Sequence, residues 1–401
     1  MKIAYNFLFI LGLFSSIGVY SQNDSFLFLD EDNHRHNKKG FKVYGEALAG
    51  SNSLNTQMFT EVLVKPSFTE KSKSAFLDGG QAKTNLYASA AWGIEYQKDS
   101  ASSFFMRNRR FQVYSSEKDF SELLFFGNGP FRGQNVTTSS LNYLQANVTE
   151  GGYRYNLLNR EKLNINSSVG LSILSGYRQV GSQAISLYTA RDGSYIDASF
   201  NNTSIVGASS GIQGLGLFSD IQVDYHTNKL NTVSFLANNI NGYHLFESNE
   251  INIDTSFRFN GVFFDVFNSE ASVTNYLDSA YNETINRNRE DKSYVFLPTQ
   301  IKLKWLFRLN PKSSIVSSFE ALSLGKYGVT AQVAYYRRFG SSLKTKTVFG
   351  YGNFIGLTWS EAIEYRREKY SFFLEINNLQ AAAIPSKTRN YGLSVGLFKQ
   401  L

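Results

Sequence analysis

Much of the chain alternates between apolar and polar residues with a period of two, which is the pattern of a β-strand with two unlike faces. The clearest case lies between residues 300 and 310, where only Leu306 breaks the polar set. One face there is apolar and the other cationic: Ile301, Leu303, Trp305, Phe307 and Leu309 oppose Lys302, Lys304 and Arg308. Asn310-Pro311-Lys312-Ser313 follows and predicts a tight turn, because proline fixes its own φ and has no N–H for a ladder.

The same alternation recurs from residue 41 to the C-terminus and predicts an all-β protein. Clear segments fall near residues 41–50, 84–96, 104–114, 163–173, 215–225 and 250–267, and hairpins follow one another after residue 298. Since a spanning strand needs about 9 to 11 residues, we predict a transmembrane antiparallel β-barrel of about 14 strands, within a range of 12 to 16. The final strand should close the barrel against the first, because an open edge cannot lie in lipid. The alternative is a secreted array of β-sandwiches, with shorter strands and the apolar face inward.

Three stretches interrupt the alternation. Residues 51–83 are irregular, and residues 269–293 are polar with an apolar spacing that predicts a short helical insertion. Residues 119–126 predict a short amphipathic helix, and the residues after it are too rich in glycine and proline for a strand. We therefore predict a plug folded into the barrel lumen, formed by Gly127, Gly129, Pro130, Phe131 and Arg132.

Composition supports a membrane barrel and excludes several other classes. Aromatic residues make up 15% of the chain, and barrels place such residues in girdles at both membrane interfaces. The net charge is +7, but the cations are dispersed, so no nucleic-acid partner is expected. Cysteine is absent, which excludes a disulfide framework, a thiolate metal site, a catalytic thiol and a lipoprotein anchor.

The N-terminus predicts export. Lys2 precedes the apolar run Phe7 to Phe14, and small residues follow before Gln22, as in a secretory signal peptide. We predict a signal peptide over residues 1–21, a flexible arm over residues 22–40 and one barrel domain over residues 41–401. The predicted location is a bacterial outer membrane, with its lipid as a partner.

Cations gather on the predicted interior faces of the strands. The candidates for lining the lumen are Lys302, Lys304, Arg308, Lys344 and Lys346, besides Arg107, Arg109 and Arg110. They could make the lumen favour anions. We favour instead a ladder of ion pairs with acids on other strands, such as Glu95, Asp224, Glu364 and Glu375.

No pattern in the chain indicates catalysis or a cofactor. His34 and His36 lie in the polar arm without a third ligand at suitable spacing, so no metal site is predicted. His226 follows Asp224, yet nothing marks a nucleophile held beside them. We therefore expect neither an enzyme nor a cofactor.

The order of segments resembles a known group of barrels. From Phe264 onward, a long strand is followed by a polar helical insertion (Ser269 to Asp291), then by Ser293-Tyr294, Leu297-Pro298-Thr299 and a strand ending in Leu309-Asn310. This order is similar to the Bacteroidota outer-membrane barrels catalogued as domain of unknown function 5723. Residues 127–134, Leu187-Tyr188-Thr189 and Tyr391-Gly392-Leu393 fit the same picture. The resemblance implies a FadL-like barrel and carries over no catalytic or ligand residue.

Two functions follow as hypotheses. The first is a FadL-like passage for small or hydrophobic molecules, which would make a small hydrophobic ligand the partner. The second is a barrel that transports nothing and acts as a scaffold for protein partners at the surface or in a secretion machine.

Overall fold

A computed structural model describes the chain from residue 39 onward, with gaps. The described residues are 39–58, 61, 69–78, 82–99, 101–207, 211–246, 248–259, 287–291, 294–322, 328–352, 356–385 and 387–401. The predicted signal peptide, nearly all of the arm and most of the predicted insertion at residues 269–293 lie outside these residues. No helix in the described ranges is long and apolar enough to cross a membrane.

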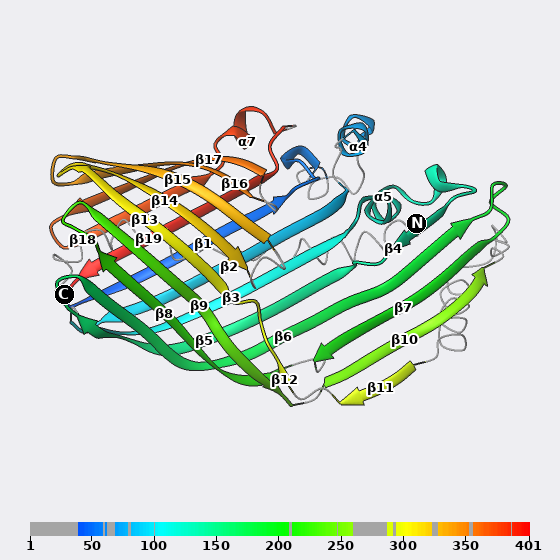
Figure 1. The fold of residues 1–401 in the computed structure, drawn as a ribbon, viewed down its shortest axis with the longest axis horizontal. Helices are drawn as coiled ribbons and strands as arrows, with labels where there is room; N and C mark the ends of the chain where they lie inside the picture. The colour runs from blue at the N-terminus through cyan, green and yellow to red at the C-terminus, as the bar shows by residue number, and fades with distance from the viewer. Residues whose placement is uncertain are drawn as a thin grey trace.

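Fourteen of the described strands pair side by side into a closed antiparallel ring (Figure 1). The ring closes where the first strand pairs with the last along their whole length, from Gly40↔Gln400 to Gly50↔Asn390. The predicted barrel and its closure are confirmed. Its strands are β1 (Gly40–Ser51), β2 (Lys83–Gln97), β3 (Ser102–Glu117), β5 (Asn142–Asn159), β6 (Leu163–Thr189), β8 (Gly214–His226), β9 (Asn231–Leu245), β13 (Gln300–Asn310), β14 (Ser313–Leu322), β15 (Gly328–Phe339), β16 (Leu343–Gly352), β17 (Gly356–Arg367), β18 (Tyr370–Asn377) and β19 (Asn390–Gln400).

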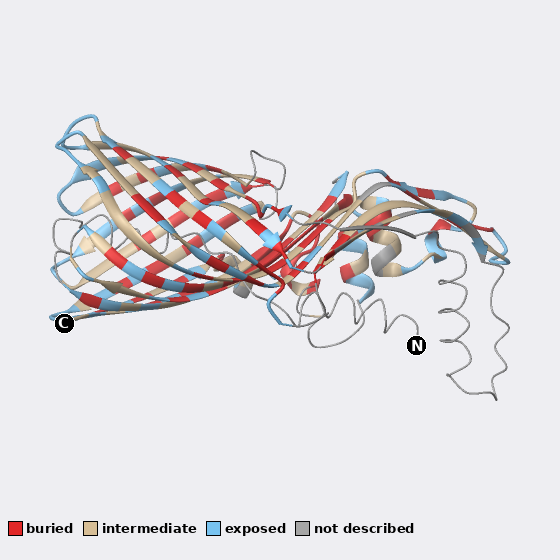
Figure 2. Ribbon diagram, turned by 90° about the horizontal axis from the view of Figure 1, so that it is seen from below, coloured by how far each residue is buried: buried red, intermediate tan, exposed pale blue. Residues whose placement is uncertain are grey.

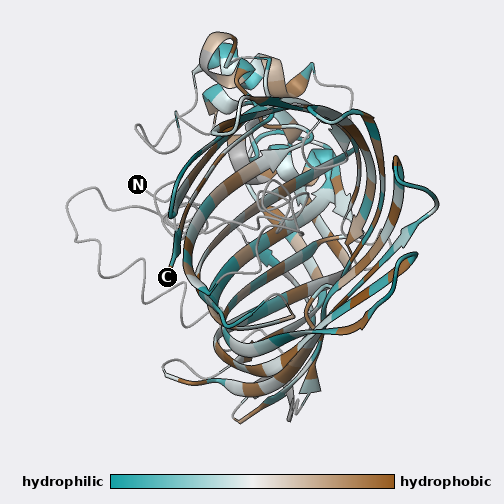
Figure 3. Ribbon diagram, turned by 90° about the vertical axis from the view of Figure 1, so that its left-hand side faces the viewer, coloured by the Kyte–Doolittle hydropathy of each residue, from teal (hydrophilic) through white to brown (hydrophobic). Residues whose placement is uncertain are grey.

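The outer wall of the ring is apolar, as the alternation predicts for a surface facing lipid. On β13, Leu303, Trp305 and Phe307 are exposed, whereas Lys302 and Lys304, which alternate with them, are buried. The other strands repeat this alternation (Figures 2 and 3). A soluble sandwich would bury the apolar set instead, so the β-sandwich alternative is excluded.

The two ends of the ring differ. Short turns join β2 to β3, β5 to β6, β8 to β9, β13 to β14, β15 to β16 and β17 to β18 at the end that holds the C-terminus. The long connections all leave from the opposite end. Barrels of the bacterial outer membrane have short periplasmic turns and longer outer loops.

At the end with the long connections, part of the sheet continues beyond the ring and forms a sheet extension (Figure 1). The first half of β6 pairs with β8 inside the ring, and its second half pairs with β7 (Ile196–Gly207). The remaining strands of the extension are β4 (Asn135–Thr138), β10 (Ser248–Phe259) and β11 (Arg287–Asp291). The short strand β12 (Tyr294–Val295) pairs with β9 where extension and ring meet.

Helices that flank the strands include α4 (Glu70–Leu77), α5 (Lys118–Phe126) and α7 (Gln380–Ala383). The expectation of a short helix at residues 119–126 is confirmed by α5. Phe120 of α5 packs with Val136 and Ile185, which lie on the face of the extension that continues the lipid-facing wall. Tyr114 points to this same side, and its hydroxyl lies 3.3 Å from that of Ser121.

The segment predicted as a plug does not lie in the ring. It forms the short 3-10 helix η2 (Gly129–Phe131) and packs against the extension, where Phe131 is buried with Phe120 and Ile185. Gly127 follows α5 with φ 80°, and the backbone of Arg132 forms an isolated β-bridge with Thr189 at the far end of β6. Phe131 fills an apolar gap beneath α5, so the segment is held outside the lumen.

Candidate functional site

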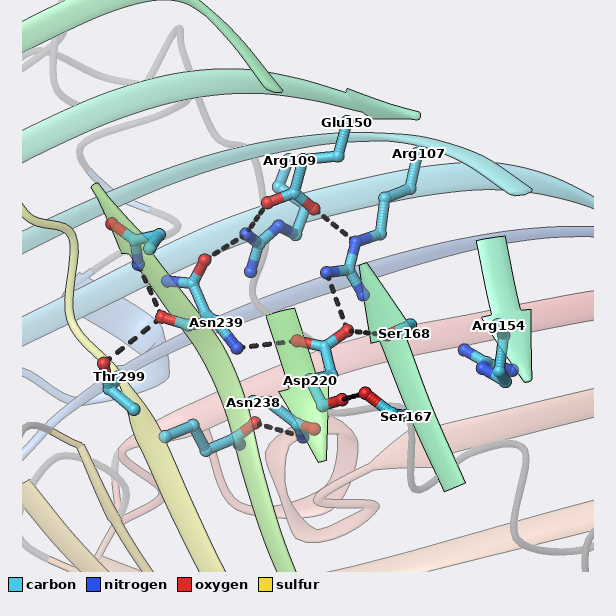
Figure 4. Close-up of polar contacts among 12 residues, drawn as sticks. Arg107, Arg109, Glu150, Arg154, Ser167, Ser168, Asp220, Asn238, Asn239 and Thr299 are labelled. Carbon is cyan, nitrogen blue, oxygen red and sulfur yellow. Dashed lines mark hydrogen bonds and ion pairs between the residues drawn. The ribbon is translucent and has the colours of Figure 1, made fainter. Parts of the chain in front are cut away.

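The interior of the ring holds a buried polar network centred on Glu150 of β5 (Figure 4). Glu150 is fully buried and accepts hydrogen bonds from Arg107 and Arg109 of β3, one at each carboxylate oxygen. Arg107 lies directly opposite Glu150 in the antiparallel register. Two cations therefore share one carboxylate in a site with almost no access to solvent.

The network also crosses the interior. Arg107 Nη2 lies 3.1 Å from Asp220 Oδ2 on β8, although β5 and β6 stand between β3 and β8 in the ring. Asp220 accepts further hydrogen bonds from the Ser168 hydroxyl at 2.9 Å and from the backbone N–H of Asn239 at 2.7 Å. This satisfies the second buried carboxylate as well.

Aromatic rings enclose the guanidinium of Arg107. Its carbon lies 5.3 Å from the ring centroid of Phe105 and 5.2 Å from that of Phe218, within the range of a cation–π interaction. Two glycines make room for these rings: a Cβ on Gly152 would lie 3.0 Å from Phe105, and one on Gly170 would lie 2.7 Å from Phe218. The part of the interior between β3 and β8 is thus packed.

Asn239 joins this network to the wall between β9 and β13. It lies in a β-bulge of β9 with φ 61°, a left-handed conformation that costs most residues energy. Its side chain accepts a hydrogen bond from Arg109 at 2.6 Å and donates one to the Pro298 carbonyl at 2.7 Å.

Beyond this bulge, side chains replace part of the backbone ladder. Asn241 accepts a hydrogen bond from the N–H of Leu297 at 2.9 Å and donates one to its carbonyl at 3.2 Å. Residues 296–299 have no strand conformation, so asparagines bridge an interruption in the wall between β12 and β13.

Four of the five predicted lysine and arginine candidates lie on the inner side of the wall. Lys302 lies 3.5 Å from Glu320, Lys344 lies 3.7 Å from Glu364, and Lys346 lies 3.1 Å from Glu375. Lys304 is buried on the same side. Arg308 is exposed near the turn that follows β13, so the structure does not bring it together with the others.

Two buried apolar clusters also face the interior. The mouth cluster lies where the extension leaves the ring, and the turn cluster lies nearer the short turns. The mouth cluster comprises Tyr87, Phe111, Val113, Leu144, Ala146, Val148, Leu174, Tyr177, Ile205, Tyr243, Leu245, Val295 and Leu297. The turn cluster comprises Val316, Ala334, Tyr336, Val348, Ala362 and Phe373.

Sequence reasoning named the cations of the network but not Glu150 or Asn239. One signal in the sequence could have identified Glu150. It lies two residues from Val148 and four from Ala146 on β5, so the alternation places it on the same inward face. In the described ranges, no three His, Asp or Glu side chains are grouped as a metal site would require.

No protein-family model matches the chain, and no curated protein matches it. Similar solved structures include the toluene transporter TodX of P. putida, at 8% identity and a TM-score of 0.46 over 96% of both chains. They also include the CymD monoaromatic hydrocarbon channel, at 7% identity and a TM-score of 0.45 over 96% of this chain and 94% of that one.

A FadL homologue of Pseudomonas aeruginosa has 10% identity and a TM-score of 0.45 over 90% of both chains. The pairing of this chain's own strands establishes the barrel. The resemblance to the family of domain of unknown function 5723 stays a prediction.

Proposed function

We propose that this protein is a bacterial outer-membrane barrel that passes small hydrophobic molecules. The observation that carries the proposal is the division of the interior into paired charges and apolar clusters. The charged groups at Glu150, Glu364 and Glu375 are buried and engaged with cations. Charged side chains that select ions in a pore line its lumen, whereas these are taken up in buried pairs.

The side chains of the apolar clusters pack on one another, so a hydrophobic solute passes by opening them, and it then gains favourable contacts along the interior. A molecule that leaves water for such a surface gains roughly 25 cal/mol for each Å² of apolar area buried. The mouth cluster lies beside the extension, at the end with the long connections. A molecule arriving from outside would meet it before the charged pairs deeper in the ring.

Uptake by the full-length protein in liposomes tests the proposal. A fluorescent hydrophobic reporter should equilibrate faster across vesicles with the barrel than across empty ones. Val148→Thr keeps the shape of the mouth cluster but adds a hydroxyl, so it should slow uptake. Val333→Thr makes the same change on the lipid face and should leave uptake unchanged. Equal rates in empty and barrel-bearing vesicles would refute the passage.

One observation favours the second candidate function, a scaffold for protein partners. The sheet extension projects beyond the ring and carries α5 packed on one face, so it could hold a partner outside the membrane. Affinity purification from solubilised membranes distinguishes the two functions. A stoichiometric partner together with no uptake would favour the scaffold.

A further inference from the structure

The second face of the sheet extension differs from the face beneath α5. On β7, Ala198 is buried and Phe200 packs against the cluster beneath α5. Their neighbours Ser199 and Asn201 therefore point to the opposite side, which continues the inner wall of the ring. We call this side the polar face, and we define it by Ser199, Asn201 and Thr203 of β7 with Asn252, Asp254 and Ser256 of β10.

The register sets these side chains in three cross-strand pairs. Ser199 lies opposite Ser256, Asn201 opposite Asp254 and Thr203 opposite Asn252. The Thr203 hydroxyl donates to the Asn252 amide oxygen at 2.7 Å. Such pairs lie about 4.5–5.5 Å apart across the strands and repeat about every 6.8 Å along them. The result is a regular grid of hydroxyl, amide and carboxylate groups.

The grid ends at an aromatic and ionic border. Arg258 makes two hydrogen bonds to Asp197, at 2.7 and 2.8 Å, and its guanidinium carbon lies 4.0 Å from the centroid of the Tyr195 ring. Tyr188 lies beside Tyr195, with centroids 6.0 Å apart. Since Asp197 neutralises Arg258, the border adds no net charge.

The chemistry of the polar face selects among classes of partner. It has no lysine or arginine, and Asp254 gives it a negative charge, so phosphate-rich lipid or nucleic acid would be repelled. It also has no large apolar side chain to anchor a protein interface. Hydroxyl and amide groups both donate and accept hydrogen bonds, which matches the hydroxyls of a sugar chain.

We propose that the polar face binds a neutral polysaccharide lying along β7 and β10, with Tyr188 at one end of the site. On the opposite face Phe200 of β7 packs against the cluster beneath α5, and β10 pairs with β7 along its whole length, so the grid is already ordered before binding and little entropy is lost. This inference is independent of the passage proposed above, because it concerns the extension and not the interior of the ring.

Binding of the full chain in detergent micelles tests this site. Immobilised dextran, starch, a β-1,3-glucan and a galactomannan serve as neutral probes, and heparin serves as the anionic control. We expect at least one neutral probe to bind with an affinity that salt hardly changes. Ser199→Leu and Asn201→Leu should each weaken that binding by roughly three- to tenfold, because each removes hydrogen-bonding groups. Ser175→Leu, at an exposed serine of β6 outside the polar face, should not.

Heat-modifiable migration on gels shows that each variant keeps its barrel. Three results would overturn the proposal: no neutral probe binds, only heparin binds and salt abolishes it, or both leucine variants bind as well as the unchanged protein. Since none of these measurements involves uptake, the passage and the glycan site can fail separately.

Discussion

At the scale of single residues, the stability of the interior depends most on Glu150. Its carboxylate compensates two buried guanidinium groups, so Glu150→Gln keeps the shape but leaves excess positive charge in a dry site. Breaking a buried pair in this way costs about 3–5 kcal/mol. The urea midpoint of unfolding in lipid vesicles should fall, whereas Glu161→Gln in the exposed β5–β6 turn should not change it. Equal midpoints would show that Glu150 carries little of the stability.

The sequence predicts some of these residues and not others, for a physical reason. Alternation alone places Lys346 inward, and pairs with acids on nearby strands, such as Glu375, follow from the hairpin order. Arg107 instead meets Asp220 across β5 and β6, 113 positions along the chain. That contact depends on ring curvature and on two glycines that admit aromatic rings, and no local pattern records either.

At the scale of elements, the bulge in β9 determines how the wall is joined to residues 296–299. Asn239→Gly should lose the hydrogen bonds to Arg109 and Pro298 but keep the left-handed backbone. Asn239→Ala should lose the same hydrogen bonds and also disfavour the left-handed backbone. The alanine variant should therefore be less stable than the glycine variant by about 1–2 kcal/mol. Denaturant titration in vesicles measures the difference, and equal losses would show that the backbone conformation contributes nothing.

The start of α5 should respond to acid through Glu117. Burial alone would favour the protonated form, but hydrogen bonds from Ser140 and Ser139 lower the pKa of Glu117 below its ordinary value of 4.5. A lowered pKa in the folded state stabilises it above that ordinary value, and this contribution disappears as the pH falls through the folded-state pKa.

Relative to the intrinsic exchange rate, the protection of residues 117–141 against hydrogen exchange should therefore fall as the pH drops below the ordinary value of 4.5. Glu117→Gln should exchange faster already at pH 7 and show a weaker pH dependence. A variant with the same acid response as the unchanged protein would assign that response to another group. Glu161→Gln is the matched control, since Glu161 lies at the opposite end of the barrel.

The sequence predicts that α5 is a helix, but it does not predict where α5 packs. The apolar spacing predicts a helix at residues 119–126, and α5 spans Lys118–Phe126. Its place beneath the extension could not be predicted, because the long strand β6 contains bulges near Ser175 and near residue 183. The first bulge reverses which positions face inward and the second restores the original order, so strict alternation assigns residues 176–182 of β6 to the wrong sides.

At the scale of the whole molecule, we expect the network that spans the ring, and not the segment predicted as a plug, to limit the passage of ions. Replacing residues 127–132 by a flexible linker of equal length should leave single-channel conductance unchanged, because these residues pack on the extension. The double variant Arg107→Ala, Asp220→Ala removes opposite charges together and should raise conductance, because it deletes the ion pair between β3 and β8. A higher conductance of the linker variant would indicate that residues 127–132 lie in the lumen. A double variant with unchanged conductance would assign the barrier to the apolar clusters.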